Sequence, residues 1–301
     1  MKSIQGQLPG GLITPEGLRE REYELHAMTG RDEEVLAENS RSSAETVTEI
    51  LTRCLKKVGN INQVDQELIR SLLVVDRQYL MMRARQLSFG DRVDAVVQCV
   101  NPDCRKRMDI DFNLSDVPIT PCEVKGEYLF KKSDVLESKE ADGDSIPWNE
   151  LRFRLPSGED QERLNLAKCD NEVDAVCMLL EQCIVSTDCG EKPDLQAIKS
   201  WPVSLRREIE DTMEKLAPNL ELTMDLKCPE CGTEFEVPFA IQDFFLKEVR
   251  ANVKVLHREV HQLAFHYHWG EDEIMSMPRQ RRQNYVGLLN EEIERINESI
   301  Q

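Results

Sequence analysis

The chain has 301 residues, 40% of them hydrophobic, which is enough for one large domain or two ordinary ones. Its 56 acidic and 38 basic residues give a net charge of -18, which argues against a protein that coats phosphate backbones. No apolar run approaches the roughly 20 residues of a membrane helix, and the N-terminus lacks the apolar run of a signal peptide. We therefore expect the chain in a reducing cytoplasm, with its cysteines as thiols or metal ligands.

The first part of the chain changes character near residue 40. Residues 1–40 are expected to form an extended arm, because the segment GQLPGGLITPEG is rich in glycine and proline. Residues 41–90 carry apolar residues at helical spacing, for example Leu68, Ile69 and Leu72, and are expected to form the N-terminal helices.

The hydrophobic period then changes to that of a β-strand. Apolar residues alternate from Val93 to Cys99, and alternation resumes at Met108 after the segment CVNPDCRKR. Two alternating runs around a short polar segment predict a β-hairpin. The cysteines Cys99 and Cys104 would lie at its tip.

A second segment, LKCPECGTEFEVPF, repeats this pattern around Cys228 and Cys231. Apolar residues stand at the same even offsets before the first cysteine of each pair and after the second. Matched offsets predict a second hairpin of the same kind. We expect the two hairpins to form one discontinuous ribbon from residues 91–122 and 220–243.

Four cysteines at two hairpin tips fit a structural zinc site, because structural zinc takes four Cys or His ligands tetrahedrally. A C-x2-C pair followed by glycine is typical of such sites, whereas the C-x4-C pair is looser and depends on the repeat. The alternative for the first pair is ordinary buried cysteines. We predict one structural Zn2+ held by Cys99, Cys104, Cys228 and Cys231. With four protein ligands, no position remains open for catalysis, and binding would join distant segments.

The remaining segments are predicted to be mainly helical. Residues 123–219 contain one short strand, LRFRLP, and are expected to form a mostly helical insertion between the hairpins. Residues 244–301 are expected to form a C-terminal helical hairpin with an apolar seam at spacings of three and four. The seam either binds a partner helix or packs on the N-terminal helices, and the sequence favours neither. The predicted fold class is α+β, mostly helical, with a zinc ribbon.

We assign partner binding to the C-terminal region, where the seam, a basic run and aromatic residues lie close in the sequence. The candidate residues are Leu256, Trp269, Arg279, Arg281, Arg282 and Tyr285. The alternative for the basic run is a solvated helix face. Four histidines between His257 and His268 suggest, as a further alternative, a metal-dependent hydrolase. The sequence lacks H-E-x-x-H and an obvious catalytic base there, which favours ordinary helix-face histidines.

Several segments, taken in order, resemble a known family. They are MTGRDEEVLAE, LSFGDRVDAVVQC, RFRLPSGEDQE, LKCPECGTEFEVPF and HYHWGEDEIMSMPRQRRQNYVGLL. Together they resemble the baseplate hub assembly chaperones of T4-like contractile phage tails, a family also found in phage-tail-like injection clusters. The resemblance implies a non-enzymatic structural or assembly component that contacts other baseplate or tail subunits.

The resemblance also implies a location in the cytoplasm of the producing cell during assembly. It leaves open whether the chain stays in the finished tail particle and whether it forms a homo-oligomer. The competing interpretation is a zinc-ribbon protein that binds nucleic acid or has a regulatory role. The net charge of -18 and the lack of aromatic residues among the basic ones count against it. We predict neither nucleic-acid binding nor membrane insertion.

Overall fold

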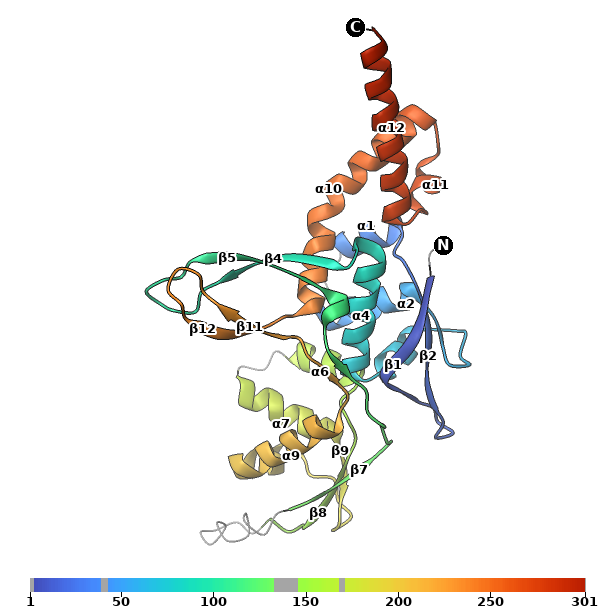
Figure 1. The fold of residues 1–301 in the computed structure, drawn as a ribbon. Coiled ribbons are helices and arrows are strands. Elements are labelled where there is room, and N and C mark those ends of the chain that lie inside the picture. Colours follow the sequence, from blue (N-terminus) through green and yellow to red (C-terminus); the bar gives the residue numbers. More distant parts are fainter. Residues whose placement is uncertain (1–2, 39–42, 133–145, 168–170, 301) are drawn as a thin grey trace.

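The structure is a computed structural model that describes residues 3–38, 43–132, 146–167 and 171–300 (Figure 1). Helices and small antiparallel sheets alternate along the chain, in agreement with the predicted mostly helical α+β class. Two β-hairpins project together to one side of the body, and the last helix extends away from it toward the C-terminus. Among the described helices, none is long and apolar enough to cross a membrane.

The N-terminal segment forms a sheet, so the expectation of an extended arm in residues 1–40 is wrong. The antiparallel sheet contains, in spatial order, β1 (Ser3–Ile13), β2 (Arg19–His26) and β3 (Leu55–Val58). The glycine-rich segment lies where β1 shifts its register against β2. There the buried carboxylate of Asp76 accepts hydrogen bonds from the N–H groups of Gly10 and Gly11, at 2.8 and 2.9 Å. This distant side chain satisfies backbone groups that the irregularity removes from the ladder.

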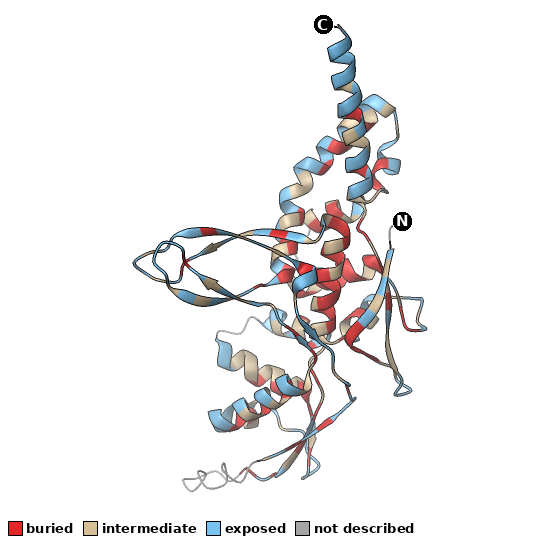
Figure 2. Cartoon of the chain, in the orientation of Figure 1, coloured by how far each residue is buried: buried red, intermediate tan, exposed pale blue. Residues whose placement is uncertain are grey.

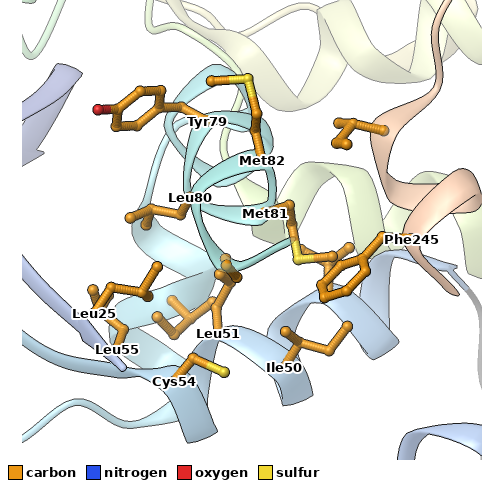
Figure 3. Packing of buried hydrophobic residues seen from close by; sticks show 14 of the residues in the cluster. Leu25, Ile50, Leu51, Cys54, Leu55, Tyr79, Leu80, Met81, Met82 and Phe245 are labelled. Carbon is orange, nitrogen blue, oxygen red and sulfur yellow. The ribbon is translucent and has the colours of Figure 1, made fainter. Parts of the chain in front are cut away.

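Four helices complete the N-terminal half. They are α1 (Gly30–Glu38), α2 (Ser43–Cys54), α3 (Gln66–Ser71) and α4 (Val74–Phe89). Residues 41–90 were expected to form helices, but they also contain strand β3. This strand begins immediately after α2 and pairs with β2 in the sheet. The core surrounds α4, where four consecutive side chains from Tyr79 to Met82 are buried and Phe245 from the C-terminal region packs beside them (Figure 3).

Residues 123–219 enclose a second hydrophobic core. Its sheet contains β7 (Tyr128–Lys131), β8 (Glu150–Phe153) and β9 (Ile184–Thr187). Its helices are α6 (Gly158–Ala167), α7 (Glu172–Cys183), α8 (Leu195–Ser200) and α9 (Val203–Leu216). Trp148 and Trp201 pack edge to face in this core, with ring centroids 5.1 Å apart. Among the described residues of this segment helices outnumber strands, and a three-stranded sheet is present of which only the strand LRFRLP was predicted.

This second half copies the first. Helices α2 and α7 each have 12 residues, end in a cysteine and lead directly into a strand of 4 residues. The strand pairing is the same: Leu25 opposes Leu55 beside an irregularity, and Phe153 opposes Ile184 beside an irregularity. Helices α3 and α8 both follow a capping aspartate. The predicted insertion is therefore the second of two tandem repeats, each of which continues into one of the cysteine hairpins.

A short pair of strands brings the two repeats together. Strand β6 (Ile119–Thr120) pairs antiparallel with β10 (Asn219–Leu220). Since β6 leads into the second core and β10 leaves it, the chain returns to the place from which it departed. This closure puts the second hairpin beside the first.

The C-terminal region contains α10 (Ile241–Tyr267), α11 (Glu271–Met275) and α12 (Arg279–Ile300). The α10 seam residues Leu246, Val249, Leu256 and Leu263 are buried, and α10 packs on α1 and α4. The seam therefore packs within the chain, which was one of the two alternatives. Figure 2 shows the buried residues concentrated in the central helices, while the outer half of α12 is largely exposed.

Candidate metal centre

The two projecting hairpins, here called the hairpin arm, have matched pairing. Their strands are β4 (Arg92–Gln98), β5 (Arg107–Asn113), β11 (Thr223–Lys227) and β12 (Glu234–Pro238). Val97 pairs with Met108 in the first hairpin, and Leu226 pairs with Phe235 in the second. These pairs stand at equal offsets from the cysteines, so the two predicted hairpins and their repeat are present in the structure.

Both hairpin tips close with the same backbone hydrogen bond. The N–H group of Cys99 donates to the carbonyl of Lys106, and that of Cys228 donates to the carbonyl of Thr233, each at 2.9 Å. In both tips the acceptor stands two residues after the second cysteine. The longer spacing of the first pair is therefore accommodated inside the turn and does not change the strand register.

The residue after the second cysteine is left-handed in both tips, with φ of 46° at Arg105 and 72° at Gly232. Glycine adopts this conformation freely, whereas a residue with a Cβ pays about 1–2 kcal/mol. Arg105 has this unfavourable conformation, which indicates that contacts around the turn hold its backbone in place. The sequence showed the glycine of the second tip but not the equivalent backbone conformation of the first.

The hairpin arm has little apolar core near its tips. At its base, Phe112 and Phe239 pack edge to face with centroids 5.0 Å apart. Toward the tips, a separate small cluster buries only Cys99, Met108 and Cys228. Such a small cluster provides little hydrophobic stabilisation, so the contact between the tips depends on the cysteines themselves.

The four predicted cysteines converge between the tips, with all Sγ atoms within 4.8 Å of one another. The Sγ atoms of Cys99 and Cys231 are 3.6 Å apart, and those of Cys104 and Cys228 are 3.8 Å apart. Sulfurs bound tetrahedrally to zinc at about 2.3 Å would be separated by about 3.8 Å. The cluster can therefore hold a metal ion, and it is the one group of possible ligands found this close within the described parts of the chain.

The electrostatics of the cluster favour deprotonation at one cysteine and oppose it at another. The hydroxyl and the N–H group of Thr233 can bond to the Cys231 thiolate and lower its pKa to about 6. Burial raises the pKa of Cys99 to about 12. Four thiolates this close repel one another, so a divalent cation is the group that would stabilise all four in the ionised form.

The histidines do not join the cysteine cluster. His257, His261, His266 and His268 are exposed on α10 and just beyond it. His257 lies 3.4 Å from a carboxylate oxygen of Glu34, and His261 stacks on Phe265. Among the described residues, these histidines form no close group of metal ligands.

Two of the predicted partner residues, Leu256 and Arg282, are buried within the chain and hold its helices together. Leu256 is fully buried beside Gly30 of α1. Arg282 is also fully buried, and it donates to Glu33 at 2.7 Å and to Glu259 at 3.0 Å. These contacts hold α10 and α12 to α1. Sequence reasoning missed Glu33 and Glu259 because helical periodicity alone gives no sign that an acidic side chain will be buried against an arginine.

The other four candidate residues lie closer to the surface. Arg279 is mostly covered; it stacks over Phe89, with its guanidinium carbon 4.7 Å from the ring centroid. Trp269 and Tyr285 are half-buried and pack edge to face, with centroids 4.9 Å apart. Arg281 is exposed beside Tyr285. Partner binding by these residues stays a prediction.

Comparison with known protein families matches residues 13–246 to the family described as T4 bacteriophage base plate protein. The matched range contains both hairpins and all four cysteines, and it ends inside α10. Comparisons with curated proteins and with solved structures gave no match. Because the family model covers well over half of the chain, the chain belongs to the T4 bacteriophage base plate protein family.

Proposed function

We propose that this chain is a non-enzymatic structural or assembly component of a contractile-tail baseplate, stabilised by one structural Zn2+ on its four cysteines. The observation that carries the proposal is the four-sulfur cluster between two equivalent hairpins in a member of a baseplate family. A subunit that positions other subunits needs a rigid frame and exposed faces. The hairpin arm supplies an exposed projection, and a metal ion at its tips would make it rigid.

The donor set supports a structural role for the metal. Four protein sulfurs fill a tetrahedral zinc ion, so no position remains for water or substrate. The cluster joins a hairpin of the first repeat to a hairpin of the second, and it lies away from both main cores. Metal binding would thus stabilise the part of the chain that hydrophobic packing stabilises least.

The competing functions have less support. The outward residues of β12 include Glu234 and Glu236, and β4 and β5 expose Asp94, Asp109 and Asp111. An acidic arm on a chain with net charge -18 would be repelled by a nucleic-acid backbone. The hydrolase alternative would need the α10 histidines to gather around a metal, and they lie separately on an exposed helix face.

Deletion and complementation test the assembly role. Producing cells that lack the gene should make few complete tails, counted by electron microscopy, and the wild-type gene should restore them. Normal tail numbers after deletion would contradict the proposal. Mass spectrometry of purified tails then separates two forms of the role: a structural subunit stays in the particle at a fixed ratio, whereas an assembly chaperone is lost from it.

A further inference from the structure

One sequence pattern recurs three times, at residues 65–77, 194–206 and 270–282. Each copy has isoleucine at its fifth position, serine at its seventh and arginine at its last. The three copies have the same length, so they align without insertions or deletions. The shared residues are Ile69, Ser71, Arg77, Ile198, Ser200, Arg206, Ile274, Ser276 and Arg282. Two copies belong to the two repeats, and the third belongs to the C-terminal helices.

The three copies also have the same local structure. In each, a short helix (α3, α8 or α11) connects closely to a long helix (α4, α9 or α12). The isoleucine is fully buried, and the serine hydroxyl donates to the carbonyl three residues earlier, at 2.7, 2.6 and 2.7 Å. The arginine is buried in every copy. These segments are called the α3–α4, α8–α9 and α11–α12 junctions below.

The α3–α4 junction binds a loop from the second repeat. The N–H group of Gly158 donates to the carbonyl of Leu72 at 2.9 Å. The N–H group of Val74 donates to the carbonyl of Pro156 at 3.1 Å. These bonds attach the loop before α6 to the beginning of α4, as in a short piece of antiparallel sheet.

The α11–α12 junction binds the equivalent loop of the first repeat. The N–H group of Gly30 donates to the carbonyl of Met277 at 3.2 Å, and Thr29 forms an antiparallel bridge with Pro278. In the other junction the corresponding bridge joins Ser157 to Leu73. Two junctions thus bind two loops in the same way.

The two bound loops share the sequence pattern Ser/Thr-Gly-x-Asp and the same internal bonds. The Asp32 carboxylate accepts from the N–H and hydroxyl groups of Thr29, at 2.8 and 2.7 Å. The Asp160 carboxylate accepts from the same groups of Ser157, at 2.8 and 3.0 Å. The aspartate therefore fixes the loop in a shape that exposes the glycine N–H to the junction.

The glycine of each loop lies against the buried arginine of the junction. A Cβ atom at Gly158 would come within 1.8 Å of Nη1 of Arg77. A Cβ atom at Gly30 would come within 3.1 Å of Nη1 of Arg282. The arginine and the glycine are thus complementary parts of one docking arrangement.

The α8–α9 junction has the junction residues but no bound loop among the described residues. Val203 is 69% exposed and Pro202 is exposed beside it. The equivalent residues Leu73 and Val74 are partly covered where the loop binds. The buried Arg206 is present, as in the other two junctions.

We propose that the α8–α9 junction is a docking site for a Ser/Thr-Gly-x-Asp loop of another subunit. The chain supplies three junctions and two such loops, and both loops are bound internally. A second copy of the chain has the same two loops bound, so the occupant is a different polypeptide. The charges fit, because the buried arginine of each occupied junction pairs with a glutamate that follows the bound loop: Arg282 with Glu33 at 2.7 Å and Arg77 with Glu162 at 4.0 Å. Arg206 offers the same charge at the α8–α9 junction. The proposal gives a partner chemistry for the proposed assembly role.

Photo-crosslinking in tail-producing cells tests this directly. The photoreactive residue p-benzoylphenylalanine is placed at Val203, and the crosslinked peptide is identified by mass spectrometry. We expect a peptide from a different polypeptide that contains Ser/Thr-Gly-x-Asp. The matched control is the same residue at Val74, which should crosslink within the chain to the segment around Pro156 and Ser157.

Three results would overturn the proposal: no crosslink from Val203 while the Val74 control reacts, a crosslinked peptide without the motif, or a crosslink to a second copy of this chain. A second variant combines Val203→Asp with p-benzoylphenylalanine at Pro202. Because Val203 is exposed, the substitution should keep the fold. It should reduce recovery of the crosslinked partner at least several-fold compared with the Pro202 probe alone. If the crosslink carries the motif but deletion leaves tails normal, the docking site stands and the baseplate role fails.

Discussion

The Sγ atom of Cys99 lies 3.6 Å from that of Cys231, although the two residues are 132 positions apart in the chain. The repeat-related contact, between Cys104 and Cys228, is 3.8 Å. Each contact joins the first cysteine of one hairpin to the second cysteine of the other. A tetrahedral ion would therefore need both repeats, so the candidate metal centre is a property of the duplicated chain.

Replacing Cys231 with serine should abolish stable zinc retention. Removal of one of four ligands should weaken binding by more than about 100-fold, since even outer-shell changes cost about 10- to 100-fold. Both main cores lie away from the tips, so the helical circular dichroism should persist while proteolysis of the hairpin arm becomes faster. The zinc content per chain is measured by inductively coupled plasma mass spectrometry after gel filtration. Cys189→Ser, exposed and outside the cluster, is the control; one zinc per chain in the Cys231 variant would contradict the site.

Truncating Leu256 should destabilise the chain itself. Leu256→Ala removes a fully buried side chain beside α1 and should lower the free energy of unfolding by about 2–5 kcal/mol. Its neighbour Val255 is 38% exposed, so Val255→Ala should cost less than about 1 kcal/mol. Urea denaturation followed by circular dichroism compares the two. Equal stabilities would mean that the α10 seam does not pack as described and would reopen its assignment to a partner.

The buried ion cluster of Arg282 with Glu33 and Glu259 predicts a large effect of removing the cation. Arg282→Met removes the cation that lies between the two buried carboxylates and leaves Glu33 with the longer contact to Arg279, at 3.5 Å. The change should cost about 3–5 kcal/mol of stability. The exposed neighbour serves as the control, because Arg281→Met should change stability by less than about 1 kcal/mol. Thermal melting at neutral pH is sufficient. An Arg282 variant with the same melting temperature as the wild type would show that this ion cluster does not stabilise the packing of α12.

Asp76 predicts a pH dependence of stability. Burial raises the pKa of this carboxyl to about 6, despite its two backbone hydrogen bonds. Because the folded pKa lies above the unfolded one, the protonated form is favoured by folding, and this contribution is gained as pH falls through 6 and lost as pH rises through it. Between pH 7 and 5 the group should add about 1 kcal/mol to the free energy of unfolding.

The measurement compares urea midpoints of the wild type and Asp76→Asn at the two pH values. The difference between them should move in favour of the wild type at pH 5. Asp94→Asn, on the exposed side of β4, controls for general charge effects. A difference that does not change with pH would show that Asp76 does not titrate in this range.

The hairpin arm could be predicted from the sequence because its information is local. Period-two alternation sets which residues face inward, and fixed offsets from each cysteine pair set the register, so Val97 opposite Met108 was readable without a structure. The spacing of Cys228 and Cys231, followed by Gly232, likewise encodes a tight turn. Sequence alone therefore determined the ligand set of the candidate metal centre.

Features that depend on contacts between residues far apart in the chain became visible only in the tertiary structure. The N-terminal strands depend on Asp76, which supports the backbone at Gly10 and Gly11 from another element, so local composition pointed to a loop. The second repeat was hidden because few of its residues match those of the first, while the same pairing and caps rebuild the same fold. The sequence left open whether Leu256 packs on the N-terminal helices or on a partner helix, and the structure shows that it packs on α1. Hydrophobic periodicity specifies that a face will be covered, and only the packed chain specifies what covers it.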